Sequence, residues 1–324
     1  MRHSKNLLIA LTVALAAGCS ANDGNDETLR GSNAELVGAP LDSGHLFSVG
    51  VCTGDVNPDG SCPVSGTANT SRCTGTLVAP NLVITSRHCT ERMNPPTTDR
   101  CTASFNGTPI HTSVQITTSS SVYQPGSTWH RVESIRIPQG SNACTDDVAL
   151  LTLATKVDVE PASVYLRQSS AELDLRQGFA MVGRGWVALR FDPVTHERIE
   201  YDTGNLERRK RENIPFVCKP TESTPCSVYE LFASPPTQAL VPGTIAYQAG
   251  AASGDSGTGV IPQVLFDKHH HYGLVAIHAT TMVGPDGRQG ASQGLLLEPH
   301  ANLIRDTARA AAQRGGYPVP DWAL

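Results

Sequence analysis

The sequence predicts an all-β fold, and three observations support this. The 324 residues include 29 Gly and 22 Pro, spread along the chain with no fixed period, as is typical of many short strands joined by turns. Short apolar runs recur between these turn signals. They do not alternate with helical patterns, so a parallel α/β sheet is not expected.

The individual elements follow from local patterns. A single helix is indicated at residues 301–314, where Ile304, Ala308 and Ala311 fall on one stripe before the stop signal of two glycines. The apolar runs that predict strands are residues 46–51, 76–78, 82–85, 148–153, 180–182, 244–247, 259–261, 272–277 and 294–297.

Composition and charge narrow the class of protein. With 39% apolar and 17% charged residues the chain can bury a substantial core. The net charge of -5 gives no electrostatic footprint for nucleic acid, so no nucleic-acid partner is expected. The one basic run, Arg208, Arg209, Lys210 and Arg211, is interpreted as a solvated loop.

Residues 1–18 have the pattern of a signal peptide, because Arg2 and Lys5 precede an apolar stretch too short to span a bilayer. The sequence Leu-Ala-Ala-Gly-Cys that ends at Cys19 resembles a bacterial lipobox, which implies lipidation of Cys19; ordinary signal-peptide cleavage is the alternative. Polar residues 19–35 are predicted to form a tether. The protein is expected to be exported, either held at the membrane by its lipid as a cell-envelope lipoprotein or secreted.

The chain has nine cysteines, and an odd number leaves one unpaired in an exported protein. If Cys19 carries a lipid, eight remain, without the spacing of a structural zinc site. The sequence does not determine the pairing. The short separations favour Cys52 with Cys62, Cys73 with Cys89 and Cys218 with Cys226, which leaves Cys101 with Cys144.

Residues 248–260, QAGAASGDSGTGV, contain Ser256, which is either a nucleophile or a residue of a tight turn. Residues 73–89, CTGTLVAPNLVITSRHC, add a histidine, His88, beside Cys89. A disulfide from Cys89 to Cys73 would anchor the loop that carries this candidate general base. The alternative is a histidine packed at a strand end.

A candidate carboxylate stands just before the apolar run 148–153. Burying a carboxylate is costly unless it is paired. A hydrogen bond to the imidazole of His88 would compensate Asp147 and fix the tautomer whose other nitrogen faces a nucleophile. The alternative, a solvated aspartate at a strand start, suits Asp146 better than Asp147.

Together the three segments resemble the trypsin-like (chymotrypsin-fold) serine endopeptidases, whose His-Cys, Asp-Ile/Val-Ala-Leu-Leu and Gly-Asp-Ser-Gly motifs occur in this order. Here they carry His88, Asp147 and Ser256, and the resemblance spans residues 36–304. It implies two six-stranded antiparallel Greek-key β-barrels packed together, with a C-terminal α-helix. The expected peptidase domain is 36–324, divided into a first barrel at 36–165, a second at 166–298 and the helix and tail at 299–324.

The resemblance also implies an activity. Ser256 attacks a peptide or ester carbonyl, His88 takes its proton and Asp147 supports the imidazolium. The N–H groups of Gly254 and Ser256 form the oxyanion hole. The expected substrates are proteins or peptides, with no cofactor and no metal, and the expected state is a monomer.

An activation step is implied as well. Leu36-Val37-Gly38-Ala39 resembles the Ile-Val-Gly-Gly that begins mature family members. Cleavage after Glu35 would release the amine of Leu36 to pair with Asp255, and would also free the protein from its tether.

Specificity is indicated by four residues. Gly250 stands where an aspartate selects Arg or Lys in the family, so trypsin-type specificity is not expected. Residues 275–278, Val-Ala-Ile-His, resemble the Gly-Ile-His of glutamate-specific bacterial members, which places His278 in the pocket with Ser253 and Thr281 near its other polar positions. The resemblance therefore implies a preference for Glu before the cut bond. The alternative is that His278 is a core histidine whose hydrogen bonds are satisfied within the protein.

Two positions depart from the family pattern. Arg87 stands where the family has a small residue, and a cation beside the base would alter its access or basicity. Ala252 replaces a cysteine four residues before the serine, so one disulfide bracing the pocket is missing.

Other interpretations are weaker. Residues 55–60 mimic the start of a calcium loop, but Gly66 occupies the twelfth position, so a turn stapled by Cys52 and Cys62 is expected. Residues 269–271, three histidines, are expected at an exposed hairpin tip.

Two other classes of protein are alternatives. In an α/β hydrolase the catalytic residues follow one another in the order Ser, Asp, His, the reverse of the order here. The serious rival is a catalytically inactive protease fold that serves as a binding module on the cell surface.

Overall fold

The computed structural model describes residues 36, 39–63, 69–94, 101, 103–122, 124–166, 174–185, 188–191, 198–202, 206–221, 226–229, 237–251, 253–268, 272–283 and 289–324. All belong to a compact unit that runs from Gly31 to Leu324. The predicted signal peptide, the tether, Cys19 and the histidines at 269–271 lie outside the described residues. Among the helices that are described, none is long and apolar enough to cross a membrane.

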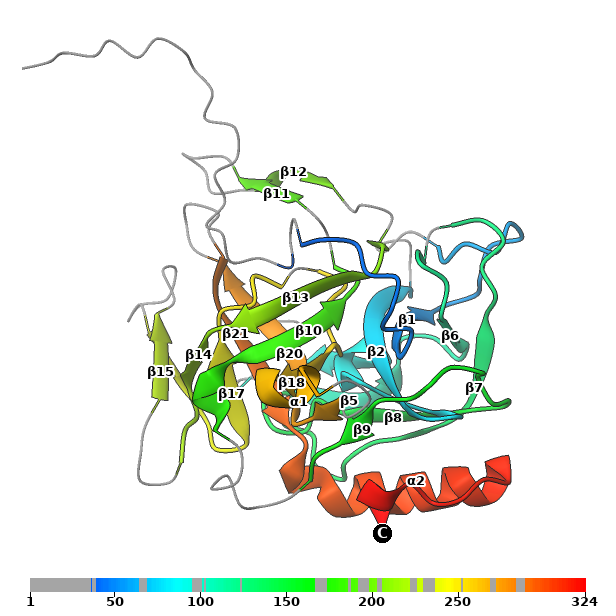
Figure 1. Ribbon diagram of the computed structural model, residues 1–324. Helices are drawn as coiled ribbons and strands as arrows, with labels where there is room; N and C mark the ends of the chain where they lie inside the picture. Colours follow the sequence, from blue (N-terminus) through cyan, green and yellow to red (C-terminus); the bar gives the residue numbers. More distant parts are fainter. Residues whose placement is uncertain are drawn as a thin grey trace, which may run out of the picture. The chain divides into compact units, whose positions relative to one another are not determined.

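The first sheet closes into a six-stranded barrel of antiparallel neighbours (Figure 1). Its interior is filled by aliphatic side chains such as Val49, Leu77, Val83 and Leu151, all fully buried. In order around the barrel the strands are β1 (Ser48–Thr53), β2 (Ser71–Ala79), β3 (Leu82–Thr85), β8 (Ala149–Leu153), β7 (His130–Arg136) and β6 (Val114–Thr117).

The second sheet has seven strands, in the order β13 (Arg209–Ile214), β10 (Phe179–Gly183), β18 (Gly259–Pro262), β20 (Ala276–Val283), β21 (Gln289–Leu296), β17 (Thr244–Tyr247) and β14 (Phe216–Cys218). The strands at its two ends, β13 and β14, are consecutive in the chain and separated by Pro215 alone. The sheet therefore curls back on itself and is nearly closed. Six strands were expected, and the seventh arises because one strand is divided: Pro215 has no N–H, and Asn213 has a left-handed φ of 57°.

The all-β prediction is confirmed. Four two-stranded sheets complete the described structure: β4 (Glu91–Asn94) with β5 (Ser104–Pro109), β9 (Ser163–Val164) with β19 (Gly273–Leu274), β11 (Ala188–Phe191) with β12 (Arg198–Asp202), and β15 (Cys226–Tyr229) with β16 (Thr237–Leu240). A short helix, α1 (Gln263–Phe266), follows β18.

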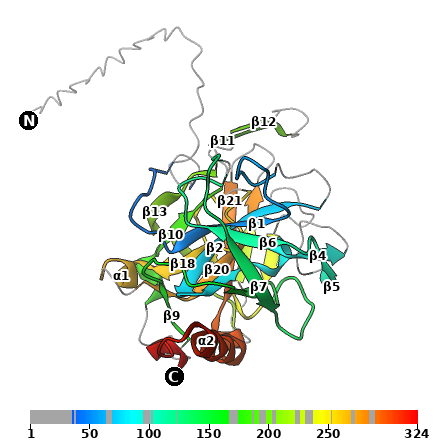
Figure 2. The same cartoon turned by 90° about the vertical axis from the view of Figure 1, so that its right-hand side faces the viewer.

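The C-terminal helix α2 (Ala301–Gly315) is also confirmed, and the two views place it beside the first barrel (Figures 1 and 2). Ile304, Ala308 and Ala311 are buried and belong to the same hydrophobic cluster as the aliphatic side chains of that barrel. Gly316 ends the helix in the left-handed conformation, with φ 64°. The predicted stripe is thus the buried face.

Disulfides join the same four cysteine pairs that the separations favour. They are Cys52–Cys62, Cys73–Cys89, Cys101–Cys144 and Cys218–Cys226. The first closes over the turn at residues 57–60, where Gly60 has φ 84° and the carboxylate of Asp59 accepts bonds from Ser61. This is the stapled turn that was expected there.

The interpretation of the basic run as a solvated loop is wrong. Arg208 is only 3% exposed, and the next three residues begin β13, which pairs with β10. A run of cations carries no apolar signal, so this strand was not predicted. β7 also lacks an apolar signal, because most of its residues are exposed, and it was not predicted either.

Candidate active site

Strand pairing brings His88 and Asp147 to one end of the first barrel. β3 and β8 are antiparallel, with Thr85 opposite Ala149. The chain that leaves β3 therefore runs beside the chain that enters β8. His88 lies in a 3-10 helix, Arg87–Cys89, whose last residue is tied to β2 by the Cys73–Cys89 disulfide.

Two hydrogen bonds join His88 to Asp147. The backbone N–H of His88 donates to Oδ1 at 2.8 Å, and Nδ1 lies 2.7 Å from Oδ2. The Asp147 side chain is wholly buried, whereas His88 is partly exposed. A carboxylate accepts, so we assign the ring proton to Nδ1, which leaves the lone pair of Nε2 directed away from Asp147.

Ser256 is partly exposed, and its main chain is held by the first barrel. Its carbonyl oxygen accepts a bond of 2.9 Å from the N–H of Thr74 in β2. The sulfur of Cys89 lies 3.9 Å from this carbonyl oxygen and 3.9 Å from Nε2 of His88. The disulfide therefore stands between the histidine and the serine segment.

Glycines shape the loop around Ser256. Gly254 has φ 101° and Gly257 has φ 85°, values that other residues rarely adopt. A Cβ on Gly257 would lie 2.2 Å from Oγ1 of Thr85 and 2.3 Å from the carbonyl oxygen of Thr74, so the loop packs directly on the first barrel. Within the described residues, the N–H groups of Gly254 and Ser256 donate to no protein oxygen.

Asp255 points away from this loop into the second sheet, where it is fully buried. Oδ1 accepts a 2.7 Å bond from the N–H of Gly185. A Cβ on Gly183 or Gly185 would lie 2.2 or 2.1 Å from the Asp255 carboxylate, so only glycine fits at either position. Leu36 is buried in the same sheet, and its N–H donates to the carbonyl oxygen of Ala249 at 2.9 Å.

Thr74 is a site residue that sequence reasoning missed. Besides its backbone bond to Ser256, its hydroxyl donates to the carbonyl oxygen of Gly254 at 2.8 Å and accepts from the N–H of Arg184 at 3.1 Å. Its own carbonyl oxygen accepts from Thr85 at 2.7 Å. The only sequence signal was its place beside Cys73, which does not indicate a role.

His278 is 2% exposed and hydrogen bonded on both ring nitrogens. The hydroxyl of Tyr247 lies 3.0 Å from Nδ1, and Thr281 Oγ1 lies 3.3 Å from Nε2 and 3.1 Å from Oγ of Ser292. Burial and the nearby carboxylate of Asp255 raise the pKa of Tyr247 well above its ordinary value, so its hydroxyl remains a neutral donor.

The other predicted pocket residues differ in their surroundings. Gly250 is buried with φ 57°, and Ser253 is exposed, in contrast to the buried His278. Of the four predicted pocket residues, His278 and Thr281 are joined by a hydrogen bond. Ala252 lies outside the described residues.

The side chain of Arg87 contacts Glu91, Gly140 and Phe105. Its guanidinium donates to both oxygens of Glu91, at 2.8 and 3.3 Å, and to the carbonyl oxygen of Gly140 at 2.6 Å. It also stacks over the ring of Phe105, 4.3 Å from its centre. The side chain is almost fully buried, so this cation forms part of the core beside β4.

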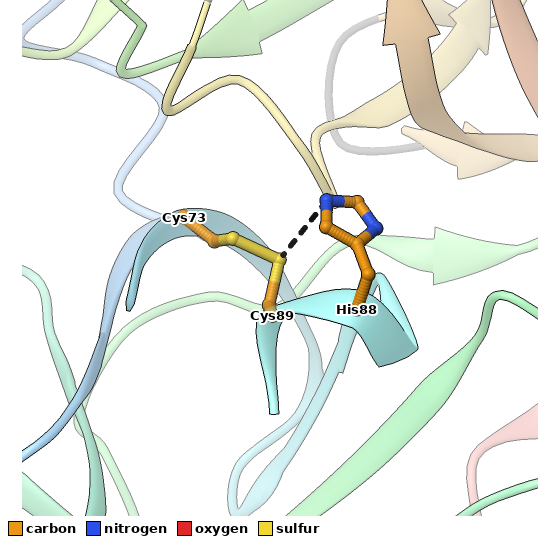
Figure 3. Close-up of side chains that lie close together, drawn as sticks. All are labelled: Cys73, His88 and Cys89. Atoms are coloured by element: carbon orange, nitrogen blue, oxygen red, sulfur yellow. Dashed lines mark hydrogen bonds between the residues drawn. A yellow bond between two sulfur atoms is a disulfide. The ribbon is translucent and has the colours of Figure 1, made fainter. Parts of the chain in front are cut away.

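Cys73, His88 and Cys89 place three metal-ligand atoms within 4.8 Å of one another (Figure 3). Metal binding by cysteine requires thiolates. Both sulfurs are consumed in the Cys73–Cys89 disulfide, so the donors of this cluster do not suit a metal.

Comparison with known proteins gives one family match. The trypsin family profile matches residues 51–213, half of the chain. The chain belongs to the trypsin family. The match includes His88 and Asp147 and ends before Ser256. No curated protein matches the chain.

Solved structures show the same fold. One is the scabies mite inactivated protease paralogue S-I1, with 13% sequence identity and a TM-score of 0.50 over 86% of this chain and 99% of that one. The two barrel-like sheets and the C-terminal helix are thus the chymotrypsin fold, as expected for a trypsin-family protein. A likeness at this identity concerns the fold alone.

We expect Thr74→Val to destabilise the protein by about 1–3 kcal/mol, because it removes the hydroxyl that bonds Gly254 and Arg184 in a buried place. Urea unfolding measures the change. The matched control is Thr108→Val, at an exposed position of β5, which we expect to change the stability by less than about 0.5 kcal/mol. Equal effects of the two variants would contradict the role assigned to Thr74.

Proposed function

We propose that this trypsin-family protein is an exported serine endopeptidase that hydrolyses peptide bonds through an acyl-enzyme. The observation that carries the proposal is the pair of hydrogen bonds by which a buried Asp147 orients His88. Burial of a carboxylate is costly unless it is paired, and these bonds both pair Asp147 and turn Nε2 of His88 away from it, as a general base requires.

In the proposed reaction Ser256 attacks the carbonyl carbon of the scissile bond while Nε2 of His88 takes the hydroxyl proton. Asp147 stabilises the imidazolium that results. The proton then passes to the leaving amine, and water repeats the sequence on the acyl-enzyme to release the acid.

The negative charge on the tetrahedral intermediate needs preorganised donors. The N–H groups of Gly254 and Ser256, which are not used by protein acceptors in the described residues, are suited to this role. The positive φ of Gly254 supports it, since the loop conformation that presents these groups depends on glycine.

A catalytically inactive binding module on the cell surface is the second candidate, because an inactivated protease paralogue has the same fold. The fold therefore does not separate the two functions. The retained Asp147–His88 pair and Ser256 favour the enzyme.

We further propose a preference for Glu before the cut bond, in a pocket formed by Gly250, Ser253, His278 and Thr281. Histidine is chemically suited to a carboxylate. The hydrogen bonds of His278 to Tyr247 and Thr281 hold its ring in one orientation, which supports recognition of a fixed ligand group.

Activation is proposed to follow cleavage after Glu35, with the new amine of Leu36 pairing with Asp255. The burial of Leu36 and Asp255 in the same sheet supports this pairing. The signal peptide and lipidation of Cys19 remain part of the proposal. Four disulfides and a trypsin-family domain are consistent with an extracellular protein.

Ser256→Ala should abolish labelling by a fluorophosphonate probe and lower kcat by about 10⁶-fold, because the nucleophile is lost. Gel detection of the labelled protein and hydrolysis of a peptide ester measure these effects. Ser104→Ala, at an exposed position of β5, is the control and should label normally. A wild-type protein that neither labels nor hydrolyses would favour the binding module.

His278→Gln should reduce the ratio of kcat/KM for a peptide with Glu before the cut bond to that for Ala by about tenfold or more, because a fixed partner of the substrate carboxylate is lost. Cleavage mapping on a mixed peptide library tests the same preference in the wild type. An unchanged ratio would show that His278 is a core residue only.

N-terminal sequencing of the active form should find Leu36 as the first residue. We expect this because the carboxylate of Asp255 can pair with Leu36 only if Leu36 has a free α-amino group. An active form that begins elsewhere would contradict the activation proposal and leave the endopeptidase proposal intact.

A further inference from the structure

The basic run of Arg208, Arg209, Lys210 and Arg211 has no place in the reaction, yet its main chain and side chains contact the N-terminal segment. This segment, residues 36–42, is described at Leu36 and at residues 39–42, and it leads into the first barrel. Three of the four cations donate to it, or to the oxygen on which it docks, through their side chains. We call these three, Arg208, Arg209 and Arg211, the clasp.

Arg208 holds the end of the segment. Its Nε lies 3.2 Å from the carbonyl oxygen of Asp42 and 3.4 Å from the Asp42 carboxylate, and its own carbonyl oxygen accepts from the N–H of Asp42 at 2.8 Å. Both side chains are buried. Burial by itself raises the pKa of Asp42, but the hydrogen bonds from His45 and the charge of Arg208 outweigh this and lower it, so the ion pair is retained.

Arg209 holds the middle of the segment. Its Nη1 donates to the carbonyl oxygen of Ala39 at 2.7 Å, and its main chain forms a bridge with Leu41. Lys210 contributes only its backbone N–H, which donates to Pro40 at 3.0 Å. Its amino group is instead paired with Glu212 at 2.8 Å.

Arg211 acts where the segment begins. Its Nη1 donates to the carbonyl oxygen of Ala249 at 2.7 Å, and the N–H of Leu36 donates to the same oxygen at 2.9 Å. Ala249 begins the stretch that continues through Gly250 to Ser256. The contact therefore joins the N-terminal segment to the start of the serine loop.

Leu36 and Ala39 are buried, whereas the two residues that follow Ala39 are exposed. Pro40 is exposed and Leu41 is 61% exposed, so apolar burial contributes little there. Charge-assisted bonds to main-chain oxygens are among the stronger contacts available to such a segment, and they do not depend on the side chains of the residues they hold.

We propose that Arg208, Arg209 and Arg211 are positioning residues that clasp Leu36 and residues 39–42 onto the second sheet and thereby fix the start of the serine loop. Only the expected effect of the clasp on activity depends on the proposed endopeptidase function. The docking itself is a property of the folded chain and is measured without catalysis.

The test compares Arg209→Gln and Arg211→Gln with Lys210→Gln, all in the full chain carrying Ser256→Ala to prevent self-processing. Hydrogen exchange at the amides of Leu36 and Asp42 is measured. Each arginine variant should raise their exchange by about tenfold through loss of a charge-assisted bond, while amides inside β1 stay unchanged. Lys210→Gln should change exchange by less than about twofold, because the backbone bond to Pro40 survives. Arg211→Lys replaces Arg211→Gln if the latter fails to fold.

In the active background, Arg211→Gln should lower kcat/KM of the processed enzyme, and the dipeptide Leu-Val should restore part of it by occupying the released site. A general loss of folding would not respond to the dipeptide. Unchanged exchange in both arginine variants, or equal exchange in all three variants, would overturn the clasp. Raised exchange in a chain whose wild type hydrolyses nothing would support the clasp and contradict the endopeptidase.

Discussion

The buried carboxylate of Asp147 and the two bonds it accepts from His88 are the constraint on which the site depends. The carboxylate lies fully buried at the entry to β8, where it is costly unless it is hydrogen bonded. The pairing of β3 with β8 brings the imidazole there, and the Cys73–Cys89 disulfide limits its movement. The same contact that stabilises the barrel therefore orients the histidine.

The second requirement is contact between the two sheets. Thr74 belongs to the first barrel, yet it forms hydrogen bonds to the main chain of Ser256 and Gly254. These two residues lie in the loop between β17 and β18 of the second sheet. Gly257 packs so closely on Thr85 and Thr74 that no side chain fits between the loop and the first barrel. The serine segment thus takes its conformation from a surface that it does not belong to, and the site forms only when both sheets are folded and packed.

The fold and the chemistry are separable in this family. An inactivated protease paralogue has the same architecture, so barrels alone do not imply catalysis. At the junction of its two sheets this chain has a paired histidine, a serine in a glycine-shaped loop and a buried Asp255 accommodated by Gly183 and Gly185. The N-terminal segment and its arginine contacts reach Ala249, where the stretch that leads to Ser256 begins.

Local patterns by themselves determined the all-β class, the helix with its buried stripe of Ile304, Ala308 and Ala311, and the segments that carry the candidate site residues. These depend on side-chain period and turn chemistry, which act over a few neighbouring residues. Only the tertiary structure decided the burial of Arg208, the strand formed by the residues after it and the role of Thr74. Their partners lie far away in the chain, and no pattern within a short window specifies which distant carbonyl oxygen or carboxylate a side chain will meet once the sheets pack.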